Sequence, residues 1–331
     1  MSKGCDRHIV RDAQQSFAST SIFFFENVLT ATQGLLQKRI NEELSGNNRR
    51  PYCSRGRGSS FFLYIHRMEP IPILYEEPHF LLVNKPAALF SQAAAGIDSL
   101  QRRLIVELKQ RDAHPGEPFI GLPHRLDRGT SGIMLIARNQ RALKRFNEQF
   151  QSRKVIKHYL AVVEGEFPHE AQRWDDWVRK IPDLPQAEIT SADGTGAKQA
   201  IAQVTRLIVA EGLSLLLVQL ETGRMHQIRI QASARGFPVV GDAPYGAQRT
   251  WLCNLGTSNE GLSEGEPVSE NATASAQSPA HPPVALHAYS LQFRHPQTAK
   301  PVQQVAPVPD NWQQLPQELL AHTVNVSLEQ L

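Results

Sequence analysis

The sequence predicts an α+β protein with a mixed, largely antiparallel sheet flanked by helices and loops. Its β-type segments do not alternate regularly with helices, as they would in a doubly wound fold. Several apolar runs are instead separated by short turns, which is typical of antiparallel hairpins. With 41% hydrophobic and 20% charged residues over 331 positions, the chain has the composition of a globular protein with a sizeable core.

The first regular elements are predicted shortly after residue 70. Apolar residues 73–75 and 80–83 flank the turn Glu76-Glu-Pro-His79, which predicts a hairpin. Asp98 is expected to cap a helix, because leucines recur at positions 100, 104 and 108.

A second strand and helix follow in the middle of the chain. Ile133-Met-Leu-Ile-Ala137 is an uninterrupted apolar run of strand length. Asn139 is expected to cap a helix that carries Leu143, Phe146 and Phe150 on one face.

The remaining elements are mostly strands. Residues 155–163 are rich in β formers, and residues 200–208 and 213–220 are expected to pair across Glu211-Gly212. A short helix is expected within residues 221–231, closed by Gly236 and Pro238. Order is expected to resume at Val284 and to fade after about Pro309.

These patterns divide the chain into three parts. Residues 1–67 are expected to form a poorly ordered extension, residues 68–310 the main folded domain and residues 311–331 a C-terminal tail. A disordered insertion is expected at about 255–283, where Ser, Glu, Ala, Pro and Asn replace apolar residues. Met68 directly precedes the patterned region, so translation starting there is an alternative hypothesis for the extension.

Composition and charge narrow the class of protein. No secretory signal or membrane-spanning run is recognisable, and the 3 cysteines are few and far apart, so a reducing, cytoplasmic location is expected. No motif for a metal or a cofactor occurs, and neither is expected. Net charge is only +3. Residues 124–158, however, carry nine basic residues against two acidic ones, a pattern that suits a polyanionic partner as well as a solvated helix face.

The run His124-Arg-Leu-Asp-Arg-Gly-Thr-Ser-Gly132 is the main candidate for chemistry. It places the carboxylate of Asp127 among arginines, on a loop anchored to the strand that follows. Arg224, His226 and Arg229 form a second cluster of cations. An arginine pairing with Asp127 would oppose its desolvation and keep it ionised, as a nucleophile or base requires. An ordinary ion pair that fixes the loop is the competing interpretation.

Four collinear motifs resemble those of the RluA-type pseudouridine synthases. They are Asn84-Lys-Pro86, the run around Asp127, Lys157-His-Tyr-Leu-Ala161, and Thr222–Arg229 together with Gly241-Asp-Ala-Pro-Tyr-Gly246. The resemblance covers about residues 70–310 outside the insertion. It implies the pseudouridine synthase catalytic fold and the isomerisation of uridine to pseudouridine in RNA, a redox-neutral reaction that needs no cofactor.

The resemblance also implies roles for single residues. Asp127 takes the place of the family's catalytic aspartate, and Arg229 that of the arginine paired with the aspartate. Tyr159 takes the place of the tyrosine that lines the uracil pocket and can serve as the base for a late proton abstraction. Arg125 takes the place of the arginine that fills the gap left by the flipped uridine.

Other residues are expected to contact the RNA or to brace the site. His226 and Gln227 are expected to brace their loop rather than to react, and His124 to be a hydrogen-bonded structural residue. The substrate- and RNA-binding residues are therefore predicted to be Arg125, Arg128, Arg224, His226 and Gln227.

Two other functions stay open at this point. A glycosidase-like hydrolase would use Asp127 but usually needs a second carboxylate, and only Asp242 is available, in a turn that favours a structural role. A noncatalytic RNA-binding or RNA-folding protein would retain the same scaffold. RNA, ribosomal or transfer, is the expected partner, with no obligate protein partner and no membrane. The sequence does not choose between the two RNAs.

Overall fold

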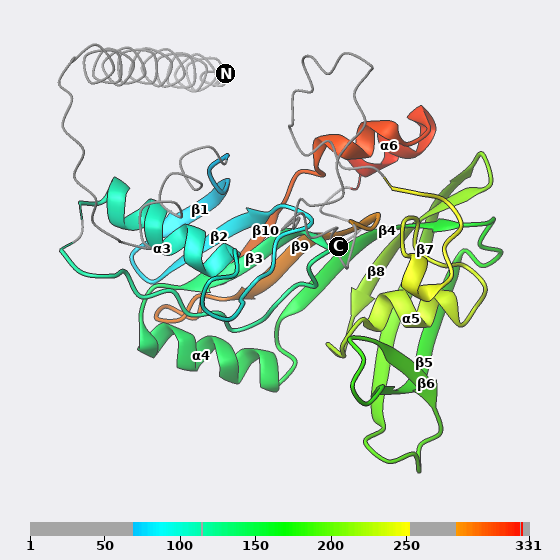
Figure 1. Cartoon of the computed structure of the whole chain (residues 1–331), viewed down its shortest axis with the longest axis horizontal. Coiled ribbons are helices and arrows are strands. Elements are labelled where there is room, and N and C mark those ends of the chain that lie inside the picture. The colour runs from blue at the N-terminus through cyan, green and yellow to red at the C-terminus, as the bar shows by residue number, and fades with distance from the viewer. Residues whose placement is uncertain (1–68, 114, 252–282, 325, 327–331) are drawn as a thin grey trace, which may run out of the picture. The chain divides into compact units, whose positions relative to one another are not determined.

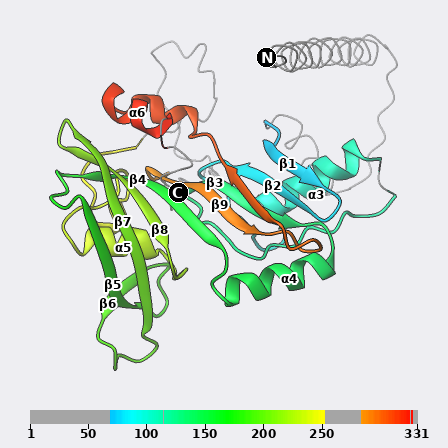
Figure 2. The same ribbon diagram turned by 180° about the vertical axis from the view of Figure 1, so that it is seen from behind.

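A sheet of ten strands organises the part of the chain that the structure describes. The computed structural model describes residues 69–113, 115–251, 283–324 and 326. The strands follow the order β1-β2-β3-β9-β4-β8-β7-β5-β6, and β10 also pairs with β9 (Figures 1 and 2). The extension predicted at residues 1–67 and nearly all of the predicted insertion lie outside the described residues. The predicted mixed, mostly antiparallel α+β architecture is confirmed.

The first three strands and two helices of the described chain form one half of the sheet and its flanking layer. They are β1 (Ile73–Glu77), β2 (Phe80–Lys85), α3 (Leu100–Arg111), β3 (Ser131–Ala137) and α4 (Gln140–Gln151). The predicted hairpin is confirmed as the antiparallel pair β1–β2. Both predicted helices are present, and Asn139 caps α4 by accepting a hydrogen bond from the Ala142 amide at 2.8 Å.

The cap of α3 differs from the prediction. Ser99, not Asp98, accepts the hydrogen bond from the Arg102 amide. Asp98 instead forms a salt bridge with Arg103, five residues further along the chain. A short hydroxyl side chain at the position next to the helix serves as the cap, and the carboxylate neutralises a largely buried guanidinium.

The other half of the sheet is built from longer strands. They are β4 (Ile156–Glu164), β5 (Ala171–Lys180), β6 (Ala187–Thr190), β7 (Lys198–Ala210) and β8 (Leu213–Leu220), with the short helix α5 (Gln227–Ser233). The predicted β7–β8 hairpin is confirmed, with Glu211 and Gly212 at φ of 53° and 70° in its turn. The sequence analysis did not identify β5 and β6.

Strand β9 (Leu286–Arg294) joins the two halves. It is antiparallel to β4 and to β10 (Pro301–Val305) but parallel to β3, where Gly132 faces Ala288. A Cβ on Gly132 would lie 2.3 Å from the Ala288 carbonyl oxygen, and its φ is 117°, so this position requires glycine. The parallel pair therefore fixes the strand that directly follows the Asp127 loop.

The chain remains ordered beyond Pro309, where the sequence analysis expected a tail. A 3₁₀ helix (Asp310–Gln314) and α6 (Gln317–Val324) follow, and α6 lies against β7. Trp312, Leu315 and Leu319 are buried in the core of the second half. The expectation of fading order was wrong because these three apolar residues are too few to produce a recognisable helical period, yet together they cover the sheet.

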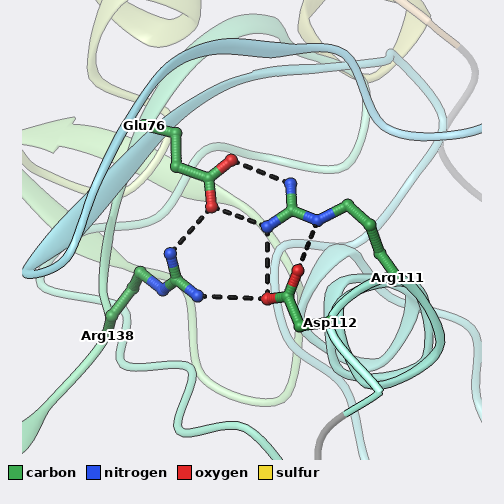
Figure 3. A network of polar contacts seen from close by, with 4 residues as sticks. All are labelled: Glu76, Arg111, Asp112 and Arg138. Atoms are coloured by element: carbon green, nitrogen blue, oxygen red, sulfur yellow. Dashed lines mark hydrogen bonds and ion pairs between the residues drawn. The ribbon is translucent and has the colours of Figure 1, made fainter. Parts of the chain in front are cut away.

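Four charged side chains tie β1, α3 and the end of β3 together at the surface (Figure 3). Arg111 donates to both carboxylate oxygens of Glu76, at 2.6 and 2.8 Å, and also to Asp112. Arg138 bridges the same two carboxylates. Hydrogen bonds from Arg111 lower the pKa of both Glu76 and Asp112. The network holds the outer end of the β1–β2 hairpin against α3.

Candidate active site

Asp127 lies in the loop that enters β3, with its side chain 32% exposed. Hydrogen bonds from buried side chains fix this loop on its inner side. The Ser91 hydroxyl donates to the Leu126 carbonyl at 2.7 Å and accepts from the Leu126 amide at 3.1 Å. Asp127 is thus partly open to solvent while the backbone beside it is held in place.

Lys85, at the end of β2, is the second anchor of this loop. Its ammonium is fully buried and donates to the carbonyls of Leu89 at 2.7 Å and Arg128 at 3.4 Å. Burial lowers the pKa of Lys85 to about 7, whereas the charge of Asp127 acts in the opposite direction. Sequence reasoning matched Lys85 to a motif but gave it no role. A lysine at the end of an otherwise apolar strand was the available signal.

The side chains of Arg229 and His226 face the same carboxylate oxygen of Asp127. Nη1 of Arg229 lies 3.7 Å from Oδ2 and Nε2 of His226 lies 3.9 Å from it. Both distances exceed those of a hydrogen bond. The structure therefore brings Arg229 beside Asp127, as the charge argument anticipated, but leaves room between the carboxylate and these two side chains.

The hydrogen-bonded partner of Arg229 is Asp242. Nε and Nη2 of Arg229 donate to the two Asp242 oxygens at 2.6 Å each, and the Asp242 side chain is fully buried. Burial alone would lower the pKa of Arg229, but the hydrogen bonds and charge of Asp242 raise it. The sequence pattern indicated a structural role for Asp242 in its turn but no partner. The structure adds that its carboxylate orients the guanidinium at the site.

Tyr245 completes the support of His226. Its hydroxyl oxygen accepts from the Ala187 amide at 2.8 Å and lies 2.9 Å from Nδ1 of His226. The Arg229 guanidinium lies over the Tyr245 ring at 4.9 Å. His226 itself has left-handed backbone, with φ of 51°, at the start of α5. One aromatic side chain thus contacts both side chains that face Asp127, a role that the sequence pattern did not indicate.

Tyr159 lies on β4 where the two halves of the core meet, because it packs against both hydrophobic clusters. Burial, together with the charge of Asp127, raises the pKa of Tyr159. Its phenol is therefore protonated at neutral pH and close enough to Asp127 to sense its charge.

The predicted RNA-binding residues occupy different environments. Arg125 is exposed beside Asp127. Arg128 turns back into its own loop, where Nε donates to the Ala88 carbonyl at 3.0 Å and the guanidinium lies over Phe90.

The start of the α5 segment is held by Gln227. Its side-chain oxygen accepts from the Thr222 hydroxyl at 2.7 Å and from the Arg224 amide at 3.0 Å, which is the bracing role expected of it. Nε of Arg224 donates to the Gln199 carbonyl. His124 also fills its expected structural role: Nε2 accepts from the Leu135 amide at 2.9 Å, and the ring stacks on Phe150.

Fold and site together place one partly exposed carboxylate, Asp127, beside the buried guanidinium of Arg229 on an α+β sheet. Within the described ranges, no group of three or more His, Cys, Asp or Glu residues is placed to hold a metal ion. No described helix is long and apolar enough to cross a membrane.

Comparison with known proteins identifies the family. Residues 79–234 match the profile of the RNA pseudouridylate synthase family. The ribosomal large subunit pseudouridine synthase D of Xylella fastidiosa is 34% identical over 247 residues, which cover 74% of this chain and 68% of the relative. The dual-specificity RNA pseudouridine synthase RluA of Vibrio parahaemolyticus is 35% identical over 186 residues, which cover 53% of this chain and 69% of the relative.

Solved structures agree on the fold. Human RNA pseudouridylate synthase domain containing 4 superposes with a TM-score of 0.54 at 20% identity, covering 81% of this chain and 95% of that one. The chain belongs to the RNA pseudouridylate synthase family and is of the RluA type. It is an RNA pseudouridine synthase, an isomerase, as the four motifs implied.

Proposed function

We propose that this enzyme isomerises uridine in ribosomal RNA, with Asp127 as its catalytic carboxylate. The observation that carries the assignment to Asp127 is its setting. It is a partly exposed anion on a loop fixed by Lys85, faced by the Arg229 guanidinium and the His226 imidazole, and its charge acts on the protonated phenol of Tyr159.

The reaction breaks the bond between C1′ and N1 of uridine, turns the uracil and joins C1′ to C5. The C5 proton is lost and N1 gains one, so no electrons are exchanged. Asp127 would either attack C1′ as a nucleophile or abstract a sugar proton and stabilise the charge that develops. Both routes require an ionised carboxylate with access to the sugar, which a side chain that is 32% exposed provides.

Arg229 would hold Asp127 in its reactive orientation. Because Asp242 already satisfies two guanidinium nitrogens, only Nη1 faces Asp127, at 3.7 Å. This distance leaves the carboxylate weakly held in the free protein, so it can reorient when the sugar arrives. Nε2 of His226 would restrain the same oxygen from a second side.

Tyr159 would form the wall against which the uracil stacks. Its raised pKa favours this role over that of a base, because a base would need the phenolate. Arg125 is exposed next to Asp127 and would occupy the gap left by the flipped nucleotide. Flipping costs a few kcal/mol, which such contacts offset.

The names of the relatives guide the choice of RNA. Two similar enzymes are named for the ribosomal large subunit and one is named dual-specificity. We therefore take ribosomal RNA as the primary substrate and transfer RNA as the second candidate, with the reaction in the cytoplasm.

The test uses RNA carrying tritium at C5 of uridine. Wild-type protein is expected to release tritium from unmodified ribosomal RNA transcripts, and Asp127→Asn is expected to release none. Asp193→Asn, an exposed aspartate in the turn after β6, serves as the matched control. If the wild-type protein releases tritium from neither ribosomal RNA nor transfer RNA, the proposal is contradicted.

A further inference from the structure

Three cations interact electrostatically near the start of β4 and have no acidic partner among the described residues. Lys157 comes from β4, Arg224 from the loop between β8 and α5, and Arg153 from the residue after the cap of α4. No ion pair is found for any of them among the described residues. The charges of Arg153 and Arg224 both act on Lys157 strongly enough to affect its titration.

Lys157 is the centre of this group. It is half-buried, and its Nζ has one acceptor within the described part of the chain, the Thr222 carbonyl at 3.5 Å, the limit of a hydrogen bond. Burial, and then the charges of Arg153 and Arg224, lower the pKa of Lys157 to about 8. An ammonium with three donors and one long contact has the capacity to bind another acceptor.

Arg224 is restrained at both its backbone and its side chain. Its Nε donates to the Gln199 carbonyl at 2.9 Å, and its amide is held by Gln227. Gly223, which precedes it, leaves room: a Cβ there would lie 3.9 Å from Nζ of Lys157. The terminal guanidinium nitrogens are then available to a ligand that approaches Lys157.

The position of the cluster indicates what it binds. Lys157 and Tyr159 are two residues apart on one strand, so their side chains lie on the same face about 7 Å apart. Lys157 also lowers the pKa of His124, which lies three residues before Asp127. A molecule that contacts Tyr159 can therefore reach Lys157 with a second, anionic group.

We propose that Lys157 and Arg224 form a phosphate-binding site for the nucleotide whose uracil lies against Tyr159, with Arg153 adding positive charge nearby. The proposal rests on the proposed function, because it takes the base at Tyr159 to be uracil. A phosphate would provide these cations with hydrogen-bond acceptors and with a negatively charged partner. The bound phosphate would also fix one end of the nucleotide while Asp127 acts on the sugar. Holding the reacting groups in a fixed geometry favours the reaction.

The direct test is the titration of Lys157 itself, followed by NMR of labelled lysine side chains and assigned with Lys157→Arg. The probes are inorganic phosphate, uridine 5′-monophosphate and uncharged uridine, at constant ionic strength. Both phosphates are expected to raise the pKa of Lys157 by about one unit or more, because a nearby anion favours the charged form. Uridine is expected to leave it unchanged. No shift with either phosphate would overturn the proposal.

RNA binding supplies the second readout. Lys157→Gln is expected to raise KM for RNA about 10- to 100-fold, as loss of a charged hydrogen bond does. It is also expected to reduce the salt slope of binding by about 0.7 to 0.9. Lys300→Gln, an exposed lysine before β10, is the control. An unchanged KM and salt slope in Lys157→Gln would contradict the site.

The two proposals fail separately. If tritium is released from RNA but phosphate leaves Lys157 unaffected, the phosphate site is wrong and the function stands. If phosphate shifts Lys157 but no RNA releases tritium, the function is wrong and the anion site stands.

Discussion

Breaking the pair between Arg229 and Asp242 is expected to destabilise the protein more than any other single change at the site. Asp242 is fully buried and the Arg229 side chain is 5% exposed, with two hydrogen bonds of 2.6 Å between them. Removing one partner of a buried pair leaves the other uncompensated, at a cost of about 3–5 kcal/mol. For a domain of this size that corresponds to a fall in Tm of roughly 6–20 °C.

The assay is urea unfolding of Arg229→Met, Asp242→Asn and the double variant. The double variant is expected to lose less stability than the sum of the single changes, with a coupling of about 1.5–3 kcal/mol. The same cycle with Asp127→Asn is expected to give a coupling below about 1 kcal/mol, because Asp127 is partly exposed and 3.7 Å away. Stronger coupling of Arg229 to Asp127 than to Asp242 would refute this reasoning.

Three further outcomes follow from the anchors of the fold. Lys85→Met keeps the side-chain volume but removes the hydrogen bonds to the carbonyls of Leu89 and of Arg128 in the Asp127 loop. Single-turnover tritium release is therefore expected to fall about 100-fold, while RNA affinity in a filter-binding assay changes little. Equal losses in rate and affinity would argue against a positioning role. Burial lowers the pKa of His287 to about 4 from its ordinary 6.5. Between these values the unfolded state binds more protons, so the free energy of unfolding should rise as pH increases from about 4 to about 6.5, and a pH series with His287→Asn should be flatter. Glu76→Gln is expected to cost about 1 kcal/mol or less in urea unfolding, but more than Glu188→Gln, because Glu76 pairs with two arginines and Glu188 with one. If Glu76→Gln and Glu188→Gln lower the free energy of unfolding equally, the second arginine paired with Glu76 adds no stability.

Elements with a clear period were predictable from the sequence. The β1–β2 and β7–β8 hairpins, α4 with its Asn139 cap and the buried strand β3 all lie where the apolar patterns placed them. Strand β5 was missed because its sequence, Ala-Gln-Arg-Trp-Asp-Asp-Trp-Val-Arg-Lys, is mostly charged or polar. Only Trp174 and Val178 of this strand are fully buried.

The sequence predicted which residues form the candidate site, but not which of them are hydrogen-bonded to each other. Local charge density and the family motifs singled out Asp127 and Arg229, which the chain brings within 3.7 Å of each other. The sequence does not reveal that Asp242 holds Arg229, because an aspartate in a glycine-containing turn is common and its burial depends on tertiary packing. The same holds for Lys85 and Tyr245, whose contacts join segments far apart in the chain.

The central claim is that Asp127 performs the chemistry while its neighbours position it. The most direct measurement is single-turnover tritium release from ribosomal RNA with excess protein, comparing wild type and Asp127→Asn at equal occupancy of RNA. The account predicts that Asp127→Asn binds the RNA and unfolds in urea like wild type, yet releases no tritium. Release at a rate close to that of wild type would contradict it.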